Sequence, residues 1–203
     1  MTSTSEAGAR SFTERSEATT AELLAEARRL FAADGFGATS IDDIVRAAGV
    51  TKGALYHHFR SKADLFRSVY VAEERRLASA LTGHVDGSQD PWSRLRAGCR
   101  GFLAEALDPH VRQIVLLDAP SVLGLAVVRD IEADSTASLL RVSLDLAAED
   151  GVLRPGDLDS RTALLTGALC DAAILVARAE DQPAALELVT RELDHLLSGF
   201  RAR

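Results

Sequence analysis

Residues 39–66 constrain the fold of this chain most strongly, because their helix start and stop signals follow one another at short intervals. Ser40 and Ser61 are each followed three residues later by a carboxylate, the capping-box pattern that opens a helix. Between them, Gly49 suits the left-handed conformation that ends a helix, and Thr51 is placed to cap the next one. We therefore predict a short helix, a tight turn, a second short helix and then a third.

The second of these short helices has one apolar side and one polar side. Leu55 and Phe59 lie four residues apart, so both are expected to point into the core. The outward residues are small, basic or hydrogen-bonding, and they are Thr51, Lys52, Gly53, Tyr56 and His57. A helix that presents such groups fits the major groove of DNA. The alternative is a three-helix bundle that binds no nucleic acid.

The stretch VTKGALYHHFRSKADLF resembles the signature of the tetracycline-repressor-like (TetR) family, and the resemblance covers about the first third of the chain. It implies that Thr51 begins the recognition helix, that the residues after it approach DNA, and that Lys62 touches a phosphate. The DNA-binding candidates are Ser40, Thr51, Lys52, Gly53, Tyr56, His57 and Lys62.

The distribution of charge agrees with a DNA-binding N-terminal part. The chain has only two lysines, Lys52 and Lys62, both at helix starts, where a cation opposes the helix dipole and an anionic partner would explain it. Residues 1–72 hold 9 basic and 9 acidic side chains, whereas residues 73–203 hold 14 and 21, which accounts for the net charge of −7. Since the first part is neutral, its phosphate contacts must be local and few.

Composition and the spacing of glycines, prolines and helix caps predict an all-α protein of about nine helices. The resemblance to the TetR family implies that these form an N-terminal three-helix helix-turn-helix DNA-binding domain and a C-terminal helical domain for ligand binding and dimerisation. Residues 1–17 lack periodicity and are expected to be a flexible arm, with the first helix beginning near Thr19. The remaining boundaries are the DNA-binding domain at 18–66, a connecting helix at 67–82, a linker at 83–90, and the effector-binding and dimerisation domain at 91–203.

The last two predicted helices indicate a homodimer. The helix at about 158–179 is apolar almost all round, and the last helix has one apolar stripe, so we expect one copy of the chain to be too small to cover both. In the TetR family these two helices pair with their copies as a four-helix bundle. The dimerisation candidates are Leu164, Gly167, Ala168, Ala172, Leu186, Val189, Leu193, Leu196 and Leu197. A two-fold dimer predicts a palindromic operator with half-sites about 34–36 Å apart.

TetR-family members bind varied small molecules inside the second domain, which implies an effector here. The candidates for an apolar cavity with polar contacts are Phe102, Leu103, Leu107, His110, Val111, Ile114, Leu125, Val128, Asp171 and Ile174. Ordinary core packing is the competing interpretation for each apolar residue. Asp171 stands out because a carboxylate amid an apolar helix needs a partner, unless it lies on an edge facing solvent.

Other classes of protein find little support in the sequence. It has no G-x-S-x-G, H-E-x-x-H, phosphate-binding loop or EF-hand loop, so we expect no enzyme, no metal and no cofactor. Cys99 and Cys170 are more simply inert than a redox switch. A cytoplasmic location is expected, because no signal-like stretch is present and the apolar run at 162–177 is short for a membrane span.

The resulting hypothesis is a sequence-specific transcriptional regulator, a dimeric repressor released from a palindromic operator by a small, largely apolar ligand. Two alternatives stay open: a DNA-binding regulator with no effector, and an activator. The operator, the regulated genes and the identity of the ligand do not follow from the sequence.

Overall fold

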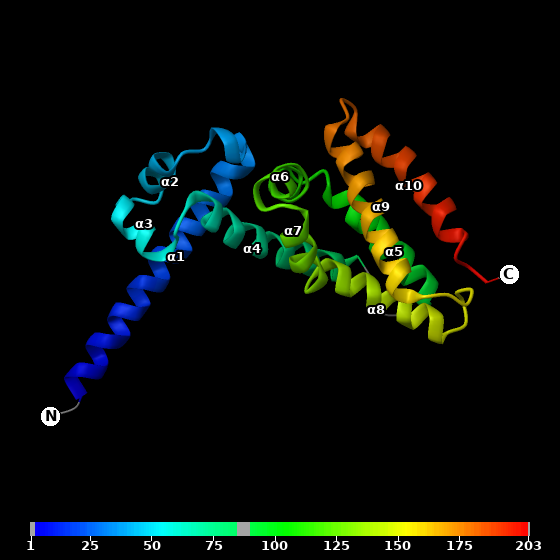
Figure 1. The fold of residues 1–203 in the computed structure, drawn as a ribbon, viewed down its shortest axis with the longest axis horizontal. Helices are drawn as coiled ribbons and strands as arrows, with labels where there is room; N and C mark the ends of the chain where they lie inside the picture. Colours follow the sequence, from blue (N-terminus) through cyan, green and yellow to red (C-terminus); the bar gives the residue numbers. More distant parts are fainter. Residues whose placement is uncertain (1–2, 85–89, 203) are drawn as a thin grey trace.

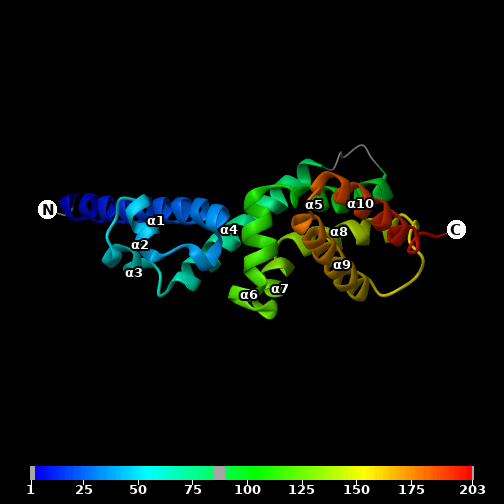
Figure 2. The same ribbon diagram turned by 90° about the horizontal axis from the view of Figure 1, so that it is seen from above.

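The computed structural model describes residues 3–84 and 90–202, with side chains from residue 16 onward. Over these residues the chain forms ten α-helices, one π-helical segment and no strand, which confirms the predicted all-α class. Figures 1 and 2 show an N-terminal group of helices at one end of an elongated molecule, a larger helical group at the other, and α4 running between them.

The N-terminal group contains α1 (Ser3–Ala38), α2 (Ile41–Ala47) and α3 (Lys52–His58). The expected helix start near Thr19 is wrong, since α1 begins at Ser3 and residues 3–17 of the predicted arm are helical. This stretch is rich in Ala, Glu and Arg, which favour helix strongly enough to continue it upstream. The predicted stop is correct, because Gly35 has φ 78° and breaks the helical path.

One apolar core unites the three N-terminal helices with the start of α4 (Lys62–Gly83). Its fully buried members include Leu23, Ala27, Phe31, Ile44, Leu55, Leu65 and Phe66. The Phe31, Phe36 and Phe66 rings meet at centroid distances of 5.2 to 5.8 Å. These contacts fix α2 and α3 on α1, so the outer face of α3 has a rigid support.

The C-terminal helices are more numerous than the sequence predicted. They are α5 (Pro91–Glu105), η1 (Val111–Asp118), α6 (Ala119–Leu123), α7 (Leu125–Ala133), α8 (Thr136–Glu149), α9 (Leu158–Arg178) and α10 (Gln182–Ser198). Gly124, with φ 82°, separates α6 from α7. Of the predicted linker at 83–90, Gly83 ends α4 and Asp90 caps α5, whereas residues 85–89 lie outside the described residues.

Two adjacent buried carboxylates on α4 tie neighbouring elements to it. Glu73 accepts two hydrogen bonds from Arg28 of α1, at 2.5 and 3.1 Å, and also contacts Arg76. Glu74 accepts hydrogen bonds from the hydroxyls of Ser135 and Thr136 at 2.7 and 3.0 Å. Burial raises the pKa of the Glu74 carboxyl. The helix α4 is thus held by polar contacts on both of its sides.

Candidate nucleic-acid interface and effector cavity

The α2–turn–α3 segment has the caps that the sequence predicted. The Ser40 hydroxyl accepts the Asp43 backbone N–H at 3.1 Å, and the Asp43 carboxylate in turn accepts the Ser40 N–H, a complete capping box. Gly49 has φ 65° in the turn. The Thr51 hydroxyl then accepts the Ala54 N–H at 3.1 Å and opens α3. The tight turn between two short helices is therefore confirmed.

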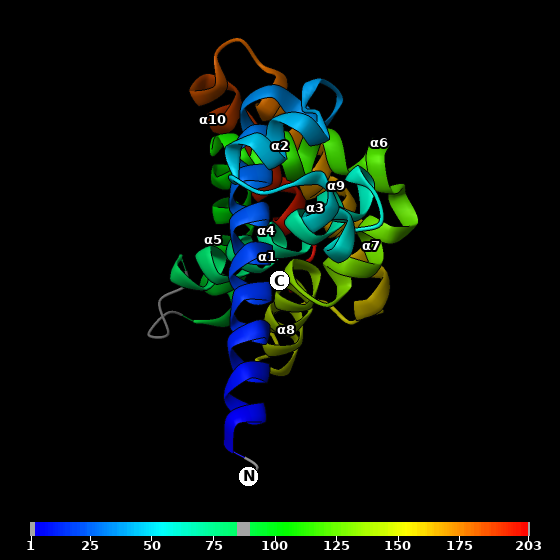
Figure 3. The same ribbon diagram turned by 90° about the vertical axis from the view of Figure 1, so that its left-hand side faces the viewer.

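The outer face of α3 is polar and open to solvent. Thr51, Lys52, Gly53, Tyr56 and His57 are all exposed, and the Tyr56 side chain is the most conspicuous because an aromatic ring is 54% exposed. The opposite face of the helix is buried through Leu55 and Phe59, as predicted. Figure 3 shows α2 and α3 together at the end of the molecule that faces the viewer. This face is accessible to a large partner.

The two lysines have different surroundings. Lys52 Nζ lies 2.8 Å from Asp42 Oδ1 on α2, and both side chains are more than half exposed. The hydrogen bond to Asp42 raises the pKa of Lys52, so the ammonium is retained. A phosphate could exchange for Asp42 at this exposed position, because a solvated ion pair is weak.

Lys62 is directed into the protein. Its Nζ donates to the backbone carbonyls of Phe36 at 2.7 Å and Thr39 at 2.8 Å, and it lies 4.1 Å from the centre of the Phe36 ring. These carbonyls belong to the chain just after α1 breaks at Gly35. The position of Lys62 at a helix start is therefore explained without an anionic partner, since its ammonium group donates to two backbone carbonyls of its own chain.

A second polar contact at this junction joins the two groups of helices. The Phe36 N–H donates to Asp118 Oδ2 at 2.7 Å, and Asp118 ends η1. The backbone of Phe36 thus accepts a hydrogen bond from Lys62 of α4 at its carbonyl and donates one to Asp118 of η1 from its N–H. A movement of α4 or η1 would be transmitted to the end of α1 through these bonds.

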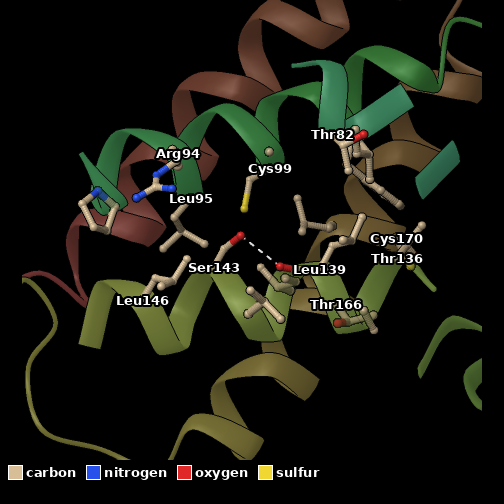
Figure 4. Close-up of a pocket in the computed structure, with 18 residues that line it drawn as sticks. Thr82, Arg94, Leu95, Cys99, Thr136, Leu139, Ser143, Leu146, Thr166 and Cys170 are labelled. Carbon is tan, nitrogen blue, oxygen red and sulfur yellow. Dashed lines mark hydrogen bonds between the residues drawn. The ribbon is translucent and has the colours of Figure 1, made fainter. Parts of the chain in front are cut away.

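An apolar cavity of about 270 Å³ lies in the C-terminal group of helices, between α4, α5, α8 and α9 (Figure 4). Its lining residues are Leu81, Thr82, Pro91, Arg94, Leu95, Gly98, Cys99, Phe102, Thr136, Ala137, Leu139, Leu140, Val142, Ser143, Leu146, Thr166, Leu169 and Cys170. This volume is near the lower end of the roughly 300–1,000 Å³ of ligand pockets. The cavity suits a small molecule.

Of the ten effector candidates, only Phe102 lines this cavity. Leu103, Val111, Ile114 and Val128 are buried in the core, and His110 and Ile174 are half-buried elsewhere. Leu107, Leu125 and Asp171 are exposed. Asp171 therefore lies on an edge of α9 that faces solvent, which was the alternative to a buried carboxylate with a partner. One physical reason is that η1, which holds the candidates Val111 and Ile114, packs on α1, α4 and α9. Most of the cavity wall comes from α5 and α8 instead.

Both cysteines of the chain line the cavity, which their spacing did not reveal. Burial raises the pKa of Cys99 to about 12 and that of Cys170 to about 12. Each is therefore a neutral thiol near pH 7, and a neutral thiol is a poor nucleophile.

The helices α9 and α10 carry an uncovered apolar face. Leu164, Leu175, Leu188 and Leu196 are 68, 65, 57 and 46% exposed. Leu175, Leu188 and Leu196 line a surface hollow together with Ala168 and Ala172. Leu175 and Leu188 were not among the dimerisation candidates, and Leu188 lies outside the stripe predicted for the last helix.

The other dimerisation candidates lie deeper within one copy of the chain. Leu193 and Leu197 are buried, and Gly167, Leu186 and Val189 are half-buried. By length and composition alone α9 could also cross a membrane, a property that core helices share. Here α9 packs against α5, α8, α10 and η1. Within the described residues, no three His, Cys, Asp or Glu side chains are grouped as metal ligands.

A capped helix-turn-helix with an exposed polar second helix, joined by one helix to a domain with an apolar cavity, defines the class of helix-turn-helix DNA-binding regulators. Residues 23–69 match the family model for bacterial regulatory proteins of the tetR family, and residues 92–200 match the tetracyclin repressor-like C-terminal domain. The chain belongs to the TetR family. It is a DNA-binding transcription regulator and not an enzyme.

Similar proteins extend over most of the chain. The Transposon Tn10 TetC protein of Escherichia coli is 27% identical over 154 residues, 76% of this chain and 78% of that protein. A TetR-family regulator from Pectobacterium atrosepticum is 34% identical with a TM-score of 0.83, covering 94% and 97% of the two chains. A structure from Saccharomonospora viridis in complex with choline shares the fold, at 18% identity and a TM-score of 0.74 over 92% and 100%.

Proposed function

We propose that this protein is a homodimeric cytoplasmic repressor that leaves a palindromic operator when a small, largely apolar ligand occupies the cavity between α4, α5, α8 and α9. The observation that carries the DNA-binding part is the exposed polar face of α3, supported from below by a closed apolar core. The domain division at 18–66, 67–82, 83–90 and 91–203 is part of the same proposal.

On DNA, the N-terminal turn of α3 enters the major groove. Thr51 and Gly53 are small enough for the backbone to approach the base edges, while Tyr56 and His57 reach bases or phosphates one turn further along. Lys52 leaves Asp42 and pairs with a phosphate, and Ser40, at the exposed start of α2, contacts the backbone of the same groove. Lys62 supports the interface from inside.

The partner for the exposed leucines of α9 and α10 is the same face of a second copy. Two-fold pairing would cover Leu164, Leu175, Leu188 and Leu196 in one four-helix arrangement, as such faces in water tend to be buried. The two copies of α3 would then face successive major grooves, so the two operator half-sites would be inverted repeats.

The route from cavity to DNA passes through α4. Leu81 and Thr82 near the end of α4 line the cavity, whereas Lys62 at its start holds the end of α1. A ligand that shifts α4 therefore changes the spacing of the two recognition helices. A coupling of about 1–3 kcal/mol would reduce operator affinity about 5- to 150-fold.

Selection of bound duplexes from a random DNA pool by the purified protein, followed by sequencing, tests this function. An enriched inverted repeat is the expected result. Absence of enrichment at low salt would contradict sequence-specific dimeric binding. Whether the selected operator lies over or upstream of a promoter then separates repression from the alternative of activation, and melting with small apolar compounds tests the alternative of a regulator without an effector.

A further inference from the structure

The cavity has one charged lining residue, Arg94. The remaining 17 residues are apolar, small, hydroxyl-bearing or thiol-bearing. Figure 4 shows Arg94 at one end of the cavity near Leu95 and Leu146, with Thr136, Thr166 and Cys170 at the opposite end. The cavity is therefore cationic at one end and carries hydroxyl and thiol groups at the other.

Arg94 differs from the other arginines of α5. Arg96 pairs with Asp194 of α10 at 3.0 Å, and Arg100 contacts the same carboxylate. Arg94 forms no ion pair with any described residue, and its Nε is buried without a hydrogen-bond partner among them. A buried donor that carries positive charge and has no acceptor is costly, and an anionic acceptor would remove this cost.

The opposite end of the cavity is unfavourable for an anion. The Thr136 hydroxyl that lines it already donates to the buried carboxylate of Glu74, at 3.0 Å. Cys170 Sγ lies 3.7 Å from both the Glu132 carboxylate and Arg129 Nη1, and these two groups are ion-paired with each other at 2.7 Å. An anionic group at this end would therefore meet an occupied hydroxyl and a cation that already has a carboxylate partner, whereas Arg94 offers an unpaired cation at the other end.

We propose that the effector of this protein is a small carboxylate-bearing molecule with an apolar body, whose carboxylate pairs with Arg94 while the body lies between α5 and α8. The role of this ligand as an effector rests on the proposed function. The binding site itself is inferred from the cavity and from Arg94, the single cation without an ion pair among the described lining residues. A guanidinium and a carboxylate form two parallel hydrogen bonds, which gives both affinity and orientation.

The test uses three probes with the same chain and different heads: octanoate, the neutral octanamide and the cationic octyltrimethylammonium. Isothermal titration of the full-length protein at pH 7 is expected to show octanoate binding at least tenfold more tightly than octanamide, with the cation weakest. Arg94→Gln should remove the preference for octanoate. Arg94→Lys should retain only part of it, because the charge remains but the two parallel hydrogen bonds are lost.

Arg75→Gln is the matched control, since Arg75 is an exposed arginine of α4 with no partner among the described residues, outside the cavity lining. It should bind octanoate as the wild type does. Equal binding of octanoate and octanamide, a preference that survives Arg94→Gln, or no binding of any probe would each overturn the proposal.

Operator binding is measured separately on the selected duplex, so the two proposals can fail independently. If octanoate binds through Arg94 but does not release DNA, the site is confirmed and its role as the effector site is wrong. If the protein selects no operator but still prefers octanoate through Arg94, the binding site stands without the proposed repressor function.

Discussion

The outer face of α3 and the cavity between α5 and α8 are built in opposite ways. The face of α3 comes from one short stretch of chain whose caps involve residues three apart, and its side chains point to solvent. The cavity draws its walls from four helices between Leu81 and Cys170, which are far apart in the sequence. Substitutions on the outer face of α3 should therefore change DNA affinity and leave stability unchanged, whereas substitutions of buried polar groups should change stability first.

The largest expected effect is on stability and comes from Glu73, the buried carboxylate between α1 and α4. Glu73→Ala leaves Arg28 without its partner and should lower the free energy of unfolding by about 3 kcal/mol. Urea denaturation followed by circular dichroism measures this. Glu149→Ala, on the exposed end of α8, is the control and should change little. Equal midpoints for the two variants would show that the inner polar contacts do not carry stability.

A charge on the uncovered face of α9 should affect DNA binding without touching α3. Leu175→Glu places a carboxylate where the second copy is expected to pack, so the protein should sediment as a monomer and lose about 100-fold in operator affinity. Leu125→Glu alters a leucine of similar exposure, 60%, on α7 and should leave the dimer intact. A Leu175→Glu dimer would place the interface elsewhere.

Lys62 and Lys52 allow the same comparison within the N-terminal helices, because Lys62 points into the protein and Lys52 is exposed. Lys62→Met removes the donor to the Phe36 and Thr39 carbonyls and should cost about 1–2 kcal/mol of stability. Lys52→Met should leave stability unchanged and reduce the slope of log affinity against log salt by about 1. Denaturation and salt titrations of both variants measure the difference. If Lys62→Met is as stable as the wild type, the assignment of a structural role to Lys62 and a DNA-binding role to Lys52 is wrong.

The smallest expected effect is a pH dependence from Glu74. Burial raises the pKa of its carboxyl above the ordinary value of a glutamate, so the folded protein holds this proton more tightly than the unfolded chain does. Its contribution to stability is therefore present at low pH and is lost as pH rises through the folded pKa. In Glu74→Gln the amide oxygen can still accept from Ser135 and Thr136, because both hydroxyls donate to one oxygen.

Glu74→Gln should thus gain stability relative to the wild type between pH 5 and pH 7.5, as measured by urea unfolding at both values. Glu149→Gln serves as the exposed control. A difference between Glu74→Gln and wild type that is the same at both pH values would mean that Glu74 does not titrate differently on folding.

The same contrast explains what the sequence could predict. The α2–turn–α3 segment was predicted to the residue, because a hydroxyl, a glycine with positive φ and a buried pair four apart act within one turn of helix. The role of Lys62 was not, since its acceptors lie 26 and 23 residues upstream. Nothing in local spacing marks a carbonyl that distant as the partner of a lysine.

The cavity was poorly predicted for a related reason. The stripe of α8 that lines it, including Leu139 and Leu146, has the same spacing as an ordinary core stripe. The early start of α1 shows a different failure, in which helix-forming residues outweighed the Ser and Thr that indicated an arm. Whether an apolar stripe lines a cavity or fills a core depends on the facing helices, and this information is not local.

The most direct test of the account is the operator affinity of Tyr56→Ala, because Tyr56 is the large exposed side chain at the centre of the proposed interface. Fluorescence anisotropy on the selected operator should show a loss of about 10-fold or more, with an unchanged urea midpoint. Unchanged affinity in a folded Tyr56→Ala dimer would contradict the claim that the outer face of α3 binds DNA.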